Sequence, residues 1–304
     1  MKEVYHICLS SHDEVLFRSP EDHYAFINLS GIEVYRAEAE LLVSAEMSTH
    51  WHQGIFSAQP IKYAAGLRMS YTHYFNRKYS RKGKIGENKI FLSKVSGFFH
   101  HLVLFNYILR NGLHHGVATT PFGYEYCSSR ELFKKELGYY SPPPVYTSRK
   151  EMAQFFPRHA EFPDHYALDR NGMLIRERFM ELRRVEQYYQ TPRNYLFQMN
   201  RLTDESWSVE QKRDRTGDPL TLADVERVDE NGIVSLLKNE KGKTAGRGLD
   251  DLDVCQLIER DFLSGSGGSV YQISRGRKKQ MAKSLFYDYH IPERQIRRCL
   301  VLRD

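Results

Sequence analysis

The chain has 304 residues, which is enough for roughly two domains that each bury a core. It carries 44 lysines and arginines against 38 aspartates and glutamates, a formal net charge of +6, and 20 tyrosines. A basic chain rich in aromatic residues favours an anionic partner, and nucleic acid is the commonest one. No apolar run approaches 18 residues, and the first residues lack the pattern of a secretion signal. We therefore expect no membrane partner.

The cysteines are scattered along the chain and form no Cys-x-x-Cys pair; they are Cys8, Cys127, Cys255 and Cys299. This spacing argues against a disulfide framework and against a zinc finger. It fits the reducing environment of the cytoplasm, which is where we expect the protein to act.

The first quarter of the chain predicts a small sheet with helices. A strand is expected at residues 4–9, and Ser19-Pro20 then begins a helix because serine can cap and proline suits the first helical position. Alternating apolar residues predict further strands at 41–47 and 50–56, and Pro60 begins a second helix. The order strand, helix, strand, strand, helix is the start of a ferredoxin-like (RRM-like) antiparallel sheet. The predicted fold class is α+β.

The third of these strands carries two histidines, His50 and His52, with Trp51 between them. Residues i and i+2 of a strand point to the same side, so both imidazoles share one face and the tryptophan occupies the other. Two neutral imidazoles are good ligands for a divalent cation. Such pairs are common, however, and a metal needs more ligands, so the pair alone is most simply a strand with two histidines.

A basic segment follows the second helix, with six lysines and arginines against one glutamate between residues 77 and 89. One acid leaves most of that charge unpaired, which favours contact with nucleic acid phosphates. The predicted DNA-binding residues here are Arg77, Lys78, Arg81, Lys82 and Lys84. Four aromatic residues precede or lie within the segment, and they either stack on unpaired bases or belong to the core: Tyr71, Tyr74, Phe75 and Tyr79.

Residues 98–111 predict a helix whose apolar stripe comprises Phe98, Leu102, Phe105 and Leu109. Tyr107 and Asn111 are four residues apart on the opposite side, so they lie one above the other. Gly112 is a natural stop for this helix. Taken alone, Tyr107 is most simply a surface tyrosine near a helix end.

Together these pieces resemble one family. His50-Trp51-His52, followed by Tyr107-Ile108-Leu109-Arg110-Asn111-Gly112, resembles the single-tyrosine HUH transposases, and most closely the REP-associated tyrosine transposases and related insertion-sequence enzymes. The resemblance covers roughly residues 3–130. The chain departs from the family at Gly112, where a proline is usual, and at Ser48-Thr49, where a pair such as Pro-Asn is usual before the first histidine.

The resemblance implies a transposase that cuts and rejoins single-stranded DNA. Tyr107 would be the nucleophile and form a 5′-phosphotyrosine, while His50, His52 and Asn111 would hold Mg²⁺ or Mn²⁺. A tyrosine with a reference pKa near 10 needs help to lose its proton, and His100 is a weak candidate for the base. The expected substrate is single-stranded DNA, typically a hairpin or palindromic repeat. The implied enzyme is bacterial, cytoplasmic and nucleoid-associated.

Beyond this domain, which we place at residues 1–135, the pattern becomes less regular. Residues 136–249 predict an accessory helical and irregular region, with a helix at 176–189 and a polar connection at 203–249. Residues 250–304 predict a basic helical tail that resembles the DnaA-like helix-turn-helix tails of some longer transposases, joined by a Ser/Gly segment at 264–269. Its predicted DNA contacts are Arg294, Arg297 and Arg298. The alternative is a basic helical hairpin that packs on the catalytic domain.

Two other functions remain open. The chain is alternatively a catalytically inactive or domesticated sequence-specific DNA-binding protein, or an HUH replication initiator that shares the histidine pair. The sequence leaves a monomer and a homodimer equally possible, with the site formed within one chain or across two.

Overall fold

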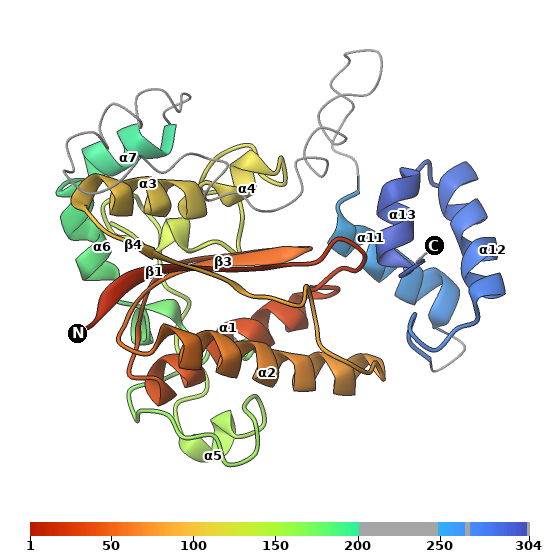
Figure 1. The fold of residues 1–304 in the computed structure, drawn as a ribbon, viewed down its shortest axis with the longest axis horizontal. Helices are drawn as coiled ribbons and strands as arrows, with labels where there is room; N and C mark the ends of the chain where they lie inside the picture. Colours follow the sequence, from red (N-terminus) through yellow and green to blue (C-terminus); the bar gives the residue numbers. More distant parts are fainter. Residues whose placement is uncertain (201–248, 265–267, 303–304) are drawn as a thin grey trace.

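The computed structural model describes residues 1–200, 249–264 and 268–302 (Figure 1). The predicted polar connection at 203–249 lies outside the described residues except for Leu249, as does the centre of the Ser/Gly segment. No helix in the described part of the chain is long and apolar enough to cross a membrane.

The central element is a four-stranded sheet in the order β2-β3-β1-β4, in which all neighbouring strands are antiparallel. Helices cover both of its faces (Figure 1). The predicted α+β class and antiparallel sheet are confirmed. The strands are β1 (Glu3–Ser10), β2 (Glu40–Met47), β3 (His50–Ser57) and β4 (Phe91–Val95).

One face of the sheet is covered by α1 (Pro20–Arg36) and α2 (Pro60–Tyr79). Trp51 of β3 points to this side, where its ring centroid lies 4.8 Å from that of Phe26 on α1. Trp51 is 1% exposed and belongs to the core between the sheet and the two helices. The prediction that the tryptophan faces away from the two histidines is confirmed.

The other face is covered by α3 (Phe98–Leu109), with α4 (Asn111–His114), α6 (Leu182–Tyr189) and α7 (Pro192–Asn200) around it (Figure 1). Since α3 lies between the sheet and these helices, both of its sides are buried. The predicted polar side was therefore wrong: Tyr107 is 3% exposed, whereas Phe98 of the expected core stripe is 42% exposed.

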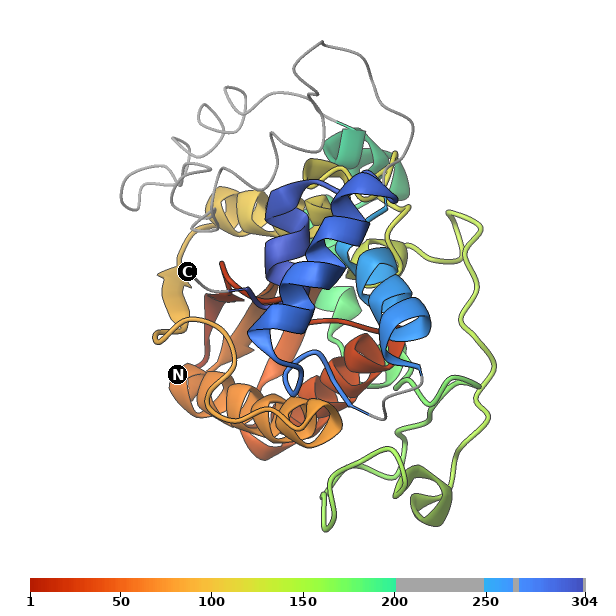
Figure 2. The same cartoon turned by 90° about the vertical axis from the view of Figure 1, so that its right-hand side faces the viewer.

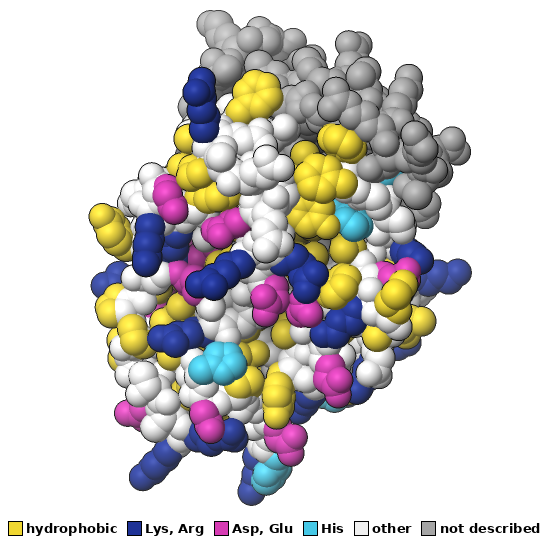
Figure 3. Space-filling model, turned by 90° about the vertical axis from the view of Figure 1, so that its left-hand side faces the viewer, with side chains coloured by type: hydrophobic (Ala, Val, Ile, Leu, Met, Phe, Trp, Pro, Cys, Tyr) yellow, Lys and Arg dark blue, Asp and Glu magenta, His cyan; other side chains and the backbone are white. Residues whose placement is uncertain are grey.

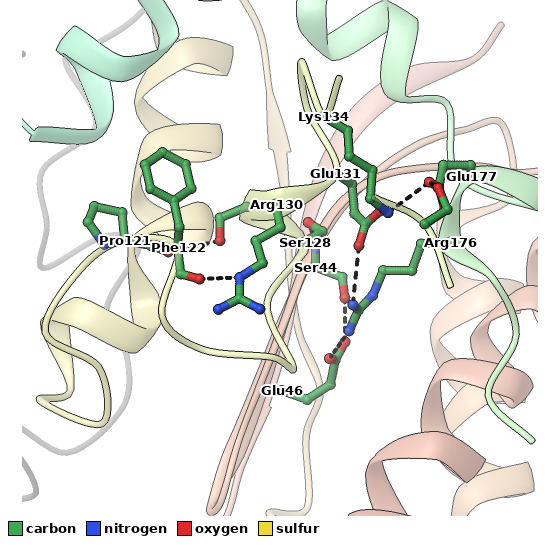
Figure 4. Close-up of polar contacts among 12 residues, drawn as sticks. Ser44, Glu46, Pro121, Phe122, Ser128, Arg130, Glu131, Lys134, Arg176 and Glu177 are labelled. Atoms are coloured by element: carbon green, nitrogen blue, oxygen red, sulfur yellow. Dashed lines mark hydrogen bonds and ion pairs between the residues drawn. The ribbon is translucent and has the colours of Figure 1, made fainter. Parts of the chain in front are cut away.

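Between α4 and α6 the chain is mostly irregular, with the short helices η1 (Ser128–Arg130), α5 (Arg149–Met152) and η2 (Arg176–Arg178). The predicted helix at 176–189 is thus interrupted, and its regular part begins at Leu182. Arg176 holds this region to the sheet, since its guanidinium lies 3.9 Å from the carboxylate of Glu46 on β2 and 3.5 Å from that of Glu131 (Figure 4).

The C-terminal unit consists of α11 (Asp251–Leu257), the π-helix η3 (Ile258–Leu263), α12 (Arg275–Tyr287) and α13 (Glu293–Cys299). It packs at one end of the sheet, beside the β1–α1 loop (Figures 1 and 2). Val15 of that loop is fully buried within the apolar core of the unit. The two predicted helices are present as α12 and α13, and the unit that contains them packs against the first part of the chain, as the alternative to a free tail predicted.

Candidate active site

Strand β3 presents His50 and His52 to the side of the sheet that α3 covers. On the neighbouring strand β1 they lie opposite Ser10 and Cys8 respectively. Gly54 is next on the same side, and a Cβ there would lie 2.8 Å from a methyl carbon of Val43 and 3.7 Å from the ring of Phe105. The glycine is where α3 approaches the sheet closely, and this contact brings the helix within reach of the histidines.

Tyr107 of α3 meets His52. Its hydroxyl oxygen lies 3.4 Å from Nε2 of His52, with the ring planes at 88°. The other ring nitrogen of His52, Nδ1, lies 3.0 Å from Nε2 of His6 on β1. When Nδ1 of His52 carries the proton and donates to His6, the lone pair on Nε2 faces the tyrosine hydroxyl. The sequence analysis did not identify the role of His6.

His50 faces a second group of side chains. Its Nε2 atom lies 3.4 Å from Oδ1 of Asn111 and 3.1 Å from Nε2 of His115, and its Nδ1 atom lies 3.2 Å from the hydroxyl of Thr49. The predicted trio His50, His52 and Asn111 thus lies at one place, together with Tyr107. His115 was missed, although it directly follows the motif in sequence. It reaches the site because the chain turns between α3 and α4.

The imidazoles of this site are neutral near pH 7. Burial lowers the pKa of His50 to about 4 and that of His6 to about 3. The pKa values of His52 and His115 also lie well below the ordinary histidine value, chiefly because of burial. A neutral imidazole keeps one nitrogen lone pair that can bind a metal or accept a hydrogen bond, whereas the lowered pKa makes each ring a weaker base.

The donor chemistry at His50 fits a divalent cation, although the side chains do not form a closed cage. Among the described residues, no group of three or more histidine, cysteine, aspartate or glutamate side chains is arranged to hold a metal ion. Asn111 adds an amide oxygen to the imidazoles, and its buried Nδ2 has no hydrogen-bond partner in the described part of the chain. Imidazole nitrogens with an amide oxygen are a donor set that Mn²⁺ and similar ions accept.

The helix that carries Tyr107 ends two residues earlier than expected. Helix α3 ends at Leu109, Arg110 interrupts it, and Gly112 lies inside the short α4 instead of stopping a helix. Gly112 is required there by packing, since a Cβ would lie 2.5 Å from Cβ of Tyr124. Gly112 stands where the transposase family that the sequence resembles usually has a proline, and Tyr124 packs directly on its backbone.

The predicted DNA-binding residues in the last turn of α2 and in the loop after it are of two kinds. Arg77, Lys82 and Lys84 are exposed. Lys78 lies 2.8 Å from the carboxylate of Asp22, and Arg81 makes an ion pair of 2.5 Å with Glu14. The expectation that most of this charge is unpaired was wrong for these last two, because acids from the β1–α1 region pair with them.

The aromatic residues near that segment belong mainly to the core. Tyr71 and Phe75 are fully buried and Tyr79 is 4% exposed, while Tyr74 is partly buried and donates to Asp22. Of the two possibilities left open, core packing is correct for Tyr71, Phe75 and Tyr79.

The three arginines predicted to bind DNA in the C-terminal unit lie in different surroundings. Arg298 donates two hydrogen bonds, of 2.7 and 2.8 Å, to Asp251. Arg297 lies 3.9 Å from Glu293 on the same helix. Arg294 and Arg298 line a pocket of about 350 Å³ that His50 and His115 also line. The pocket lies where the C-terminal unit meets the histidine end of β3.

No family model and no curated protein matches this chain. Among solved structures, it is similar to a chain described as the structure of a REP-associated tyrosine transposase bound to a REP hairpin, with 11% sequence identity and a TM-score of 0.36. The overlap covers 45% of this chain and 83% of that one. A likeness of this size does not assign a function, which has to come from the residues of the site.

Proposed function

We propose that the protein is a single-tyrosine HUH nuclease of the transposase type, which cuts and rejoins single-stranded DNA. The observation that carries the proposal is the position of the Tyr107 hydroxyl, 3.4 Å from Nε2 of His52, beside a site that also contains His50 and Asn111. These residues are distant in sequence, and each belongs to the motif pattern that the sequence analysis describes. The strand order β2-β3-β1-β4 supports the ferredoxin-like arrangement in which such a site is expected.

The reaction is a transesterification. The phenolic oxygen of Tyr107 attacks the scissile phosphorus and forms a new P–O bond, while the bond from phosphorus to the 3′ oxygen breaks and that oxygen leaves as a 3′-hydroxyl. His52 accepts the phenolic proton at Nε2, and a proton is returned to the leaving oxygen. A second 3′-hydroxyl reverses the step and joins a new strand without further energy input.

His50, Asn111 and His115 would hold the divalent ion. His115 replaces the predicted ligand His52 in this proposal, because Nε2 of His52 faces the hydroxyl of Tyr107. When bound, Mg²⁺ or Mn²⁺ supplies Lewis-acid polarisation of the phosphate. Nε2 of His6 accepts a hydrogen bond from Nδ1 of His52 in this proposal, which leaves the lone pair on Nε2 of His52 facing Tyr107. The side chains of α3 and β3 exclude water from the tyrosine, since Tyr107 is almost completely buried.

We infer that the DNA partner is single-stranded and folded as a hairpin or palindromic repeat. The exposed residues Arg77, Lys82 and Lys84 supply positive charge for its backbone. Lys78 and Arg81 contribute less in this proposal, because their charges are already paired. We propose a monomer or a homodimer acting in the cytoplasm near the nucleoid.

The test is the formation of a covalent adduct. The native chain is incubated with labelled single-stranded hairpin DNA and Mg²⁺ or Mn²⁺, and the products are separated under denaturing conditions. A DNA-bound protein band, mapped to Tyr107 by peptide mass spectrometry, supports the proposal. DNA binding without any adduct favours the inactive, domesticated DNA-binding protein. An adduct on another tyrosine rejects the assignment of the nucleophile.

A further inference from the structure

The pocket at His50 has two walls from different parts of the chain. His50, His115 and Tyr126 line it from the catalytic side, and Asp253 and Arg294 line it from the C-terminal unit. Its volume of about 350 Å³ lies within the range of small-ligand pockets, which run from roughly 300 to 1,000 Å³. Without the C-terminal unit, the wall formed by Asp253 and Arg294 would be missing and the pocket would be open on that side.

The second wall is held in place close to the histidines. Asp251 accepts a hydrogen bond of 2.8 Å from the hydroxyl of Ser48, two residues before His50, while it also binds the guanidinium of Arg298. A second contact joins the C-terminal unit to the β1–α1 loop, where the hydroxyl oxygen of Tyr271 lies 3.3 Å from the carboxylate of Glu14. The C-terminal unit is therefore a fixed wall of the pocket.

The charge of the pocket disfavours a phosphate group. Four carboxylate residues line it, against two arginines of which Arg298 is already bound to Asp251. Away from the ion proposed at His50 and His115, a phosphate would meet unfavourable electrostatic repulsion from these acids. The acids are Asp250, Asp251, Asp253 and Glu125.

The same groups suit the edge of a nucleobase, which offers both donors and acceptors. Carboxylates accept from exocyclic amino groups, and an arginine donates to base carbonyl and ring nitrogen atoms. Aromatic rings lie at the catalytic wall, where the imidazole of His23 stacks on Tyr126 with centroids 3.5 Å apart. Flat rings of this kind are the surfaces on which unpaired bases stack.

We propose that this pocket receives one unpaired base of the DNA strand beside the scissile phosphate, so that the C-terminal unit helps to set where the strand is cut. The inference rests on the proposed function for the identity of the ligand. In this proposal the C-terminal unit contacts the DNA strand at the cleavage site, and it does not act as an independent tail that binds duplex DNA. Arg294 is the side chain expected to donate to the base, and Asp253 is the one expected to accept from it.

The face farthest from the C-terminal unit carries basic and acidic side chains interspersed, with hydrophobic ones between them (Figure 3). By contrast, Ser11 and His12 line both the pocket at His50 and a second cavity that includes Lys82 and Lys84. A DNA strand that leaves the pocket past Ser11 and His12 reaches the exposed side chains of Lys82 and Lys84.

The experiment scans a single-stranded hairpin substrate with one abasic site at a time and measures binding by fluorescence anisotropy. All proteins carry Tyr107→Phe, so that binding is read without cleavage. We expect one position next to the cut to weaken binding by roughly five- to a hundred-fold, the discrimination typical of one good base contact. In Arg294→Ala the same abasic site should have little further effect, because the contact is already absent.

Arg297→Ala is the matched control, since Arg297 is on the same helix but lines a different cavity with Phe286 and Tyr287. It should retain the full abasic penalty. Asp253→Asn gives a second variant, which should change the preferred base at the sensitive position. The inference is overturned if no position is sensitive, if the penalty persists unchanged in both Arg294→Ala and Asp253→Asn, or if the chain does not bind the substrate at all.

Failure of the two proposals can be told apart. An abasic penalty in the Tyr107→Phe protein together with no adduct from the native chain rejects the nuclease and retains the base pocket as part of a DNA-binding protein. A Tyr107 adduct from the native chain together with no sensitive position in the Tyr107→Phe protein rejects the pocket and retains the nuclease.

Discussion

The hydroxyl oxygen of Tyr107 lies 3.4 Å from Nε2 of His52, although the two residues belong to a helix and a strand on opposite sides of a packing interface. Gly54 makes this possible, because the absence of a side chain there lets α3 pack closely against β3. Tyr107 and His52 are thus positioned by ordinary core packing. A site positioned in this way is rigid, which suits catalysis that depends on orientation.

Replacing Tyr107 with phenylalanine should abolish the covalent adduct while the protein still binds DNA. The change removes one oxygen whose hydrogen-bonding neighbour is His52, so we expect the free energy of unfolding to change by about 1 kcal/mol or less. Denaturing gels measure the adduct and anisotropy measures binding.

The control for this variant is Tyr124→Phe. Tyr124 is another tyrosine beside the site, and its hydroxyl donates to the backbone carbonyl of Glu46. It should keep the adduct, since its hydroxyl is engaged away from His52. Adduct formation that survives in Tyr107→Phe and disappears in Tyr124→Phe would exchange the roles of the two tyrosines.

The metal prediction concerns His50 and His115, whose Nε2 atoms lie 3.1 Å apart. Each alanine substitution should weaken Mn²⁺ binding, measured by calorimetry or electron paramagnetic resonance without DNA, and EDTA should stop cleavage by the native protein. Asn111→Ala should weaken binding less, because water can replace a neutral amide. His165→Ala is a control, since His165 is bonded to the carbonyl of Arg178. Cleavage that continues in EDTA would reject a metal-dependent mechanism.

The arrangement of the histidine strand could be predicted because the two-residue period of a strand leaves little freedom. Once residues 50–56 are extended, Trp51 must face one side and His50 and His52 the other, and the structure has this arrangement. The helical period predicted that Tyr107 and Asn111 share one side of a single helix, but the helix is interrupted at Arg110 and Asn111 belongs to α4. Local geometry thus determined which residues of the strand share a face, but not the relation between Tyr107 and Asn111.

The remaining features depend on contacts between distant parts of the chain. A helical wheel shows which residues of α3 share a side, but it does not show that Tyr107 faces His52 on the sheet while Asn106 contacts Tyr189 of α6 and Gln198 of α7. Similarly, the basic segment after α2 looks unpaired in sequence because the partner of Arg81 is Glu14, 67 residues away. His115 reaches His50 only through the break at Arg110, which no motif indicated.

Glu46 provides a prediction about pH. This carboxyl is fully buried, and desolvation raises its pKa to about 7 despite the nearby Arg176. Because the folded-state pKa lies above the unfolded value, the protonated group stabilises the fold below about pH 4.5, and that stabilisation is lost as pH rises through 7. The full change corresponds to roughly 3 kcal/mol.

Glu46→Gln should remove this pH dependence. The measurement is the difference in the free energy of unfolding between native and variant protein from pH 4.5 to 8. The buried histidines stabilise the fold more as pH rises, but this contribution is the same in both proteins and cancels in the difference. Glu136→Gln, at an exposed position, should show no comparable difference. A difference that does not change with pH would mean that Glu46 is already ionised at acidic pH.

Gly112→Ala should destabilise the protein and disturb the site together. The added methyl would lie 2.5 Å from Cβ of Tyr124, so the backbone around Asn111 has to shift. We expect a loss of about 1–3 kcal/mol in the free energy of unfolding, typical of overpacking. Gly138→Ala tests the specificity of the effect: nothing lies within 4 Å of a Cβ there, although its φ of +76° adds backbone strain. Mn²⁺ affinity should fall for Gly112→Ala and stay unchanged for Gly138→Ala.

The final prediction concerns the attachment of the C-terminal unit through Val15. A tail joined only by a flexible segment could be removed without affecting the rest of the protein, but Val15 of the β1–α1 loop is fully buried in the core of this unit. Val15→Ala should therefore lower the free energy of unfolding by about 1–3 kcal/mol, from the lost transfer energy and the cavity left behind. Val145→Ala is the matched control, because Val145 is 46% exposed and should have little effect.

Thermal unfolding followed by calorimetry separates the two views of the unit. If Val15 joins both parts into one cooperative structure, the native protein unfolds in a single transition, and Val15→Ala shifts that whole transition to a lower temperature. Removal of residues 249–304 would then expose Val15 and the Tyr79 ring that Tyr271 packs against, so the shortened chain should unfold at a lower temperature or aggregate. Two separate transitions, of which only the C-terminal one responds to Val15→Ala, would show instead that the C-terminal unit unfolds independently. The pocket at His50 could then open while the first 200 residues stay folded.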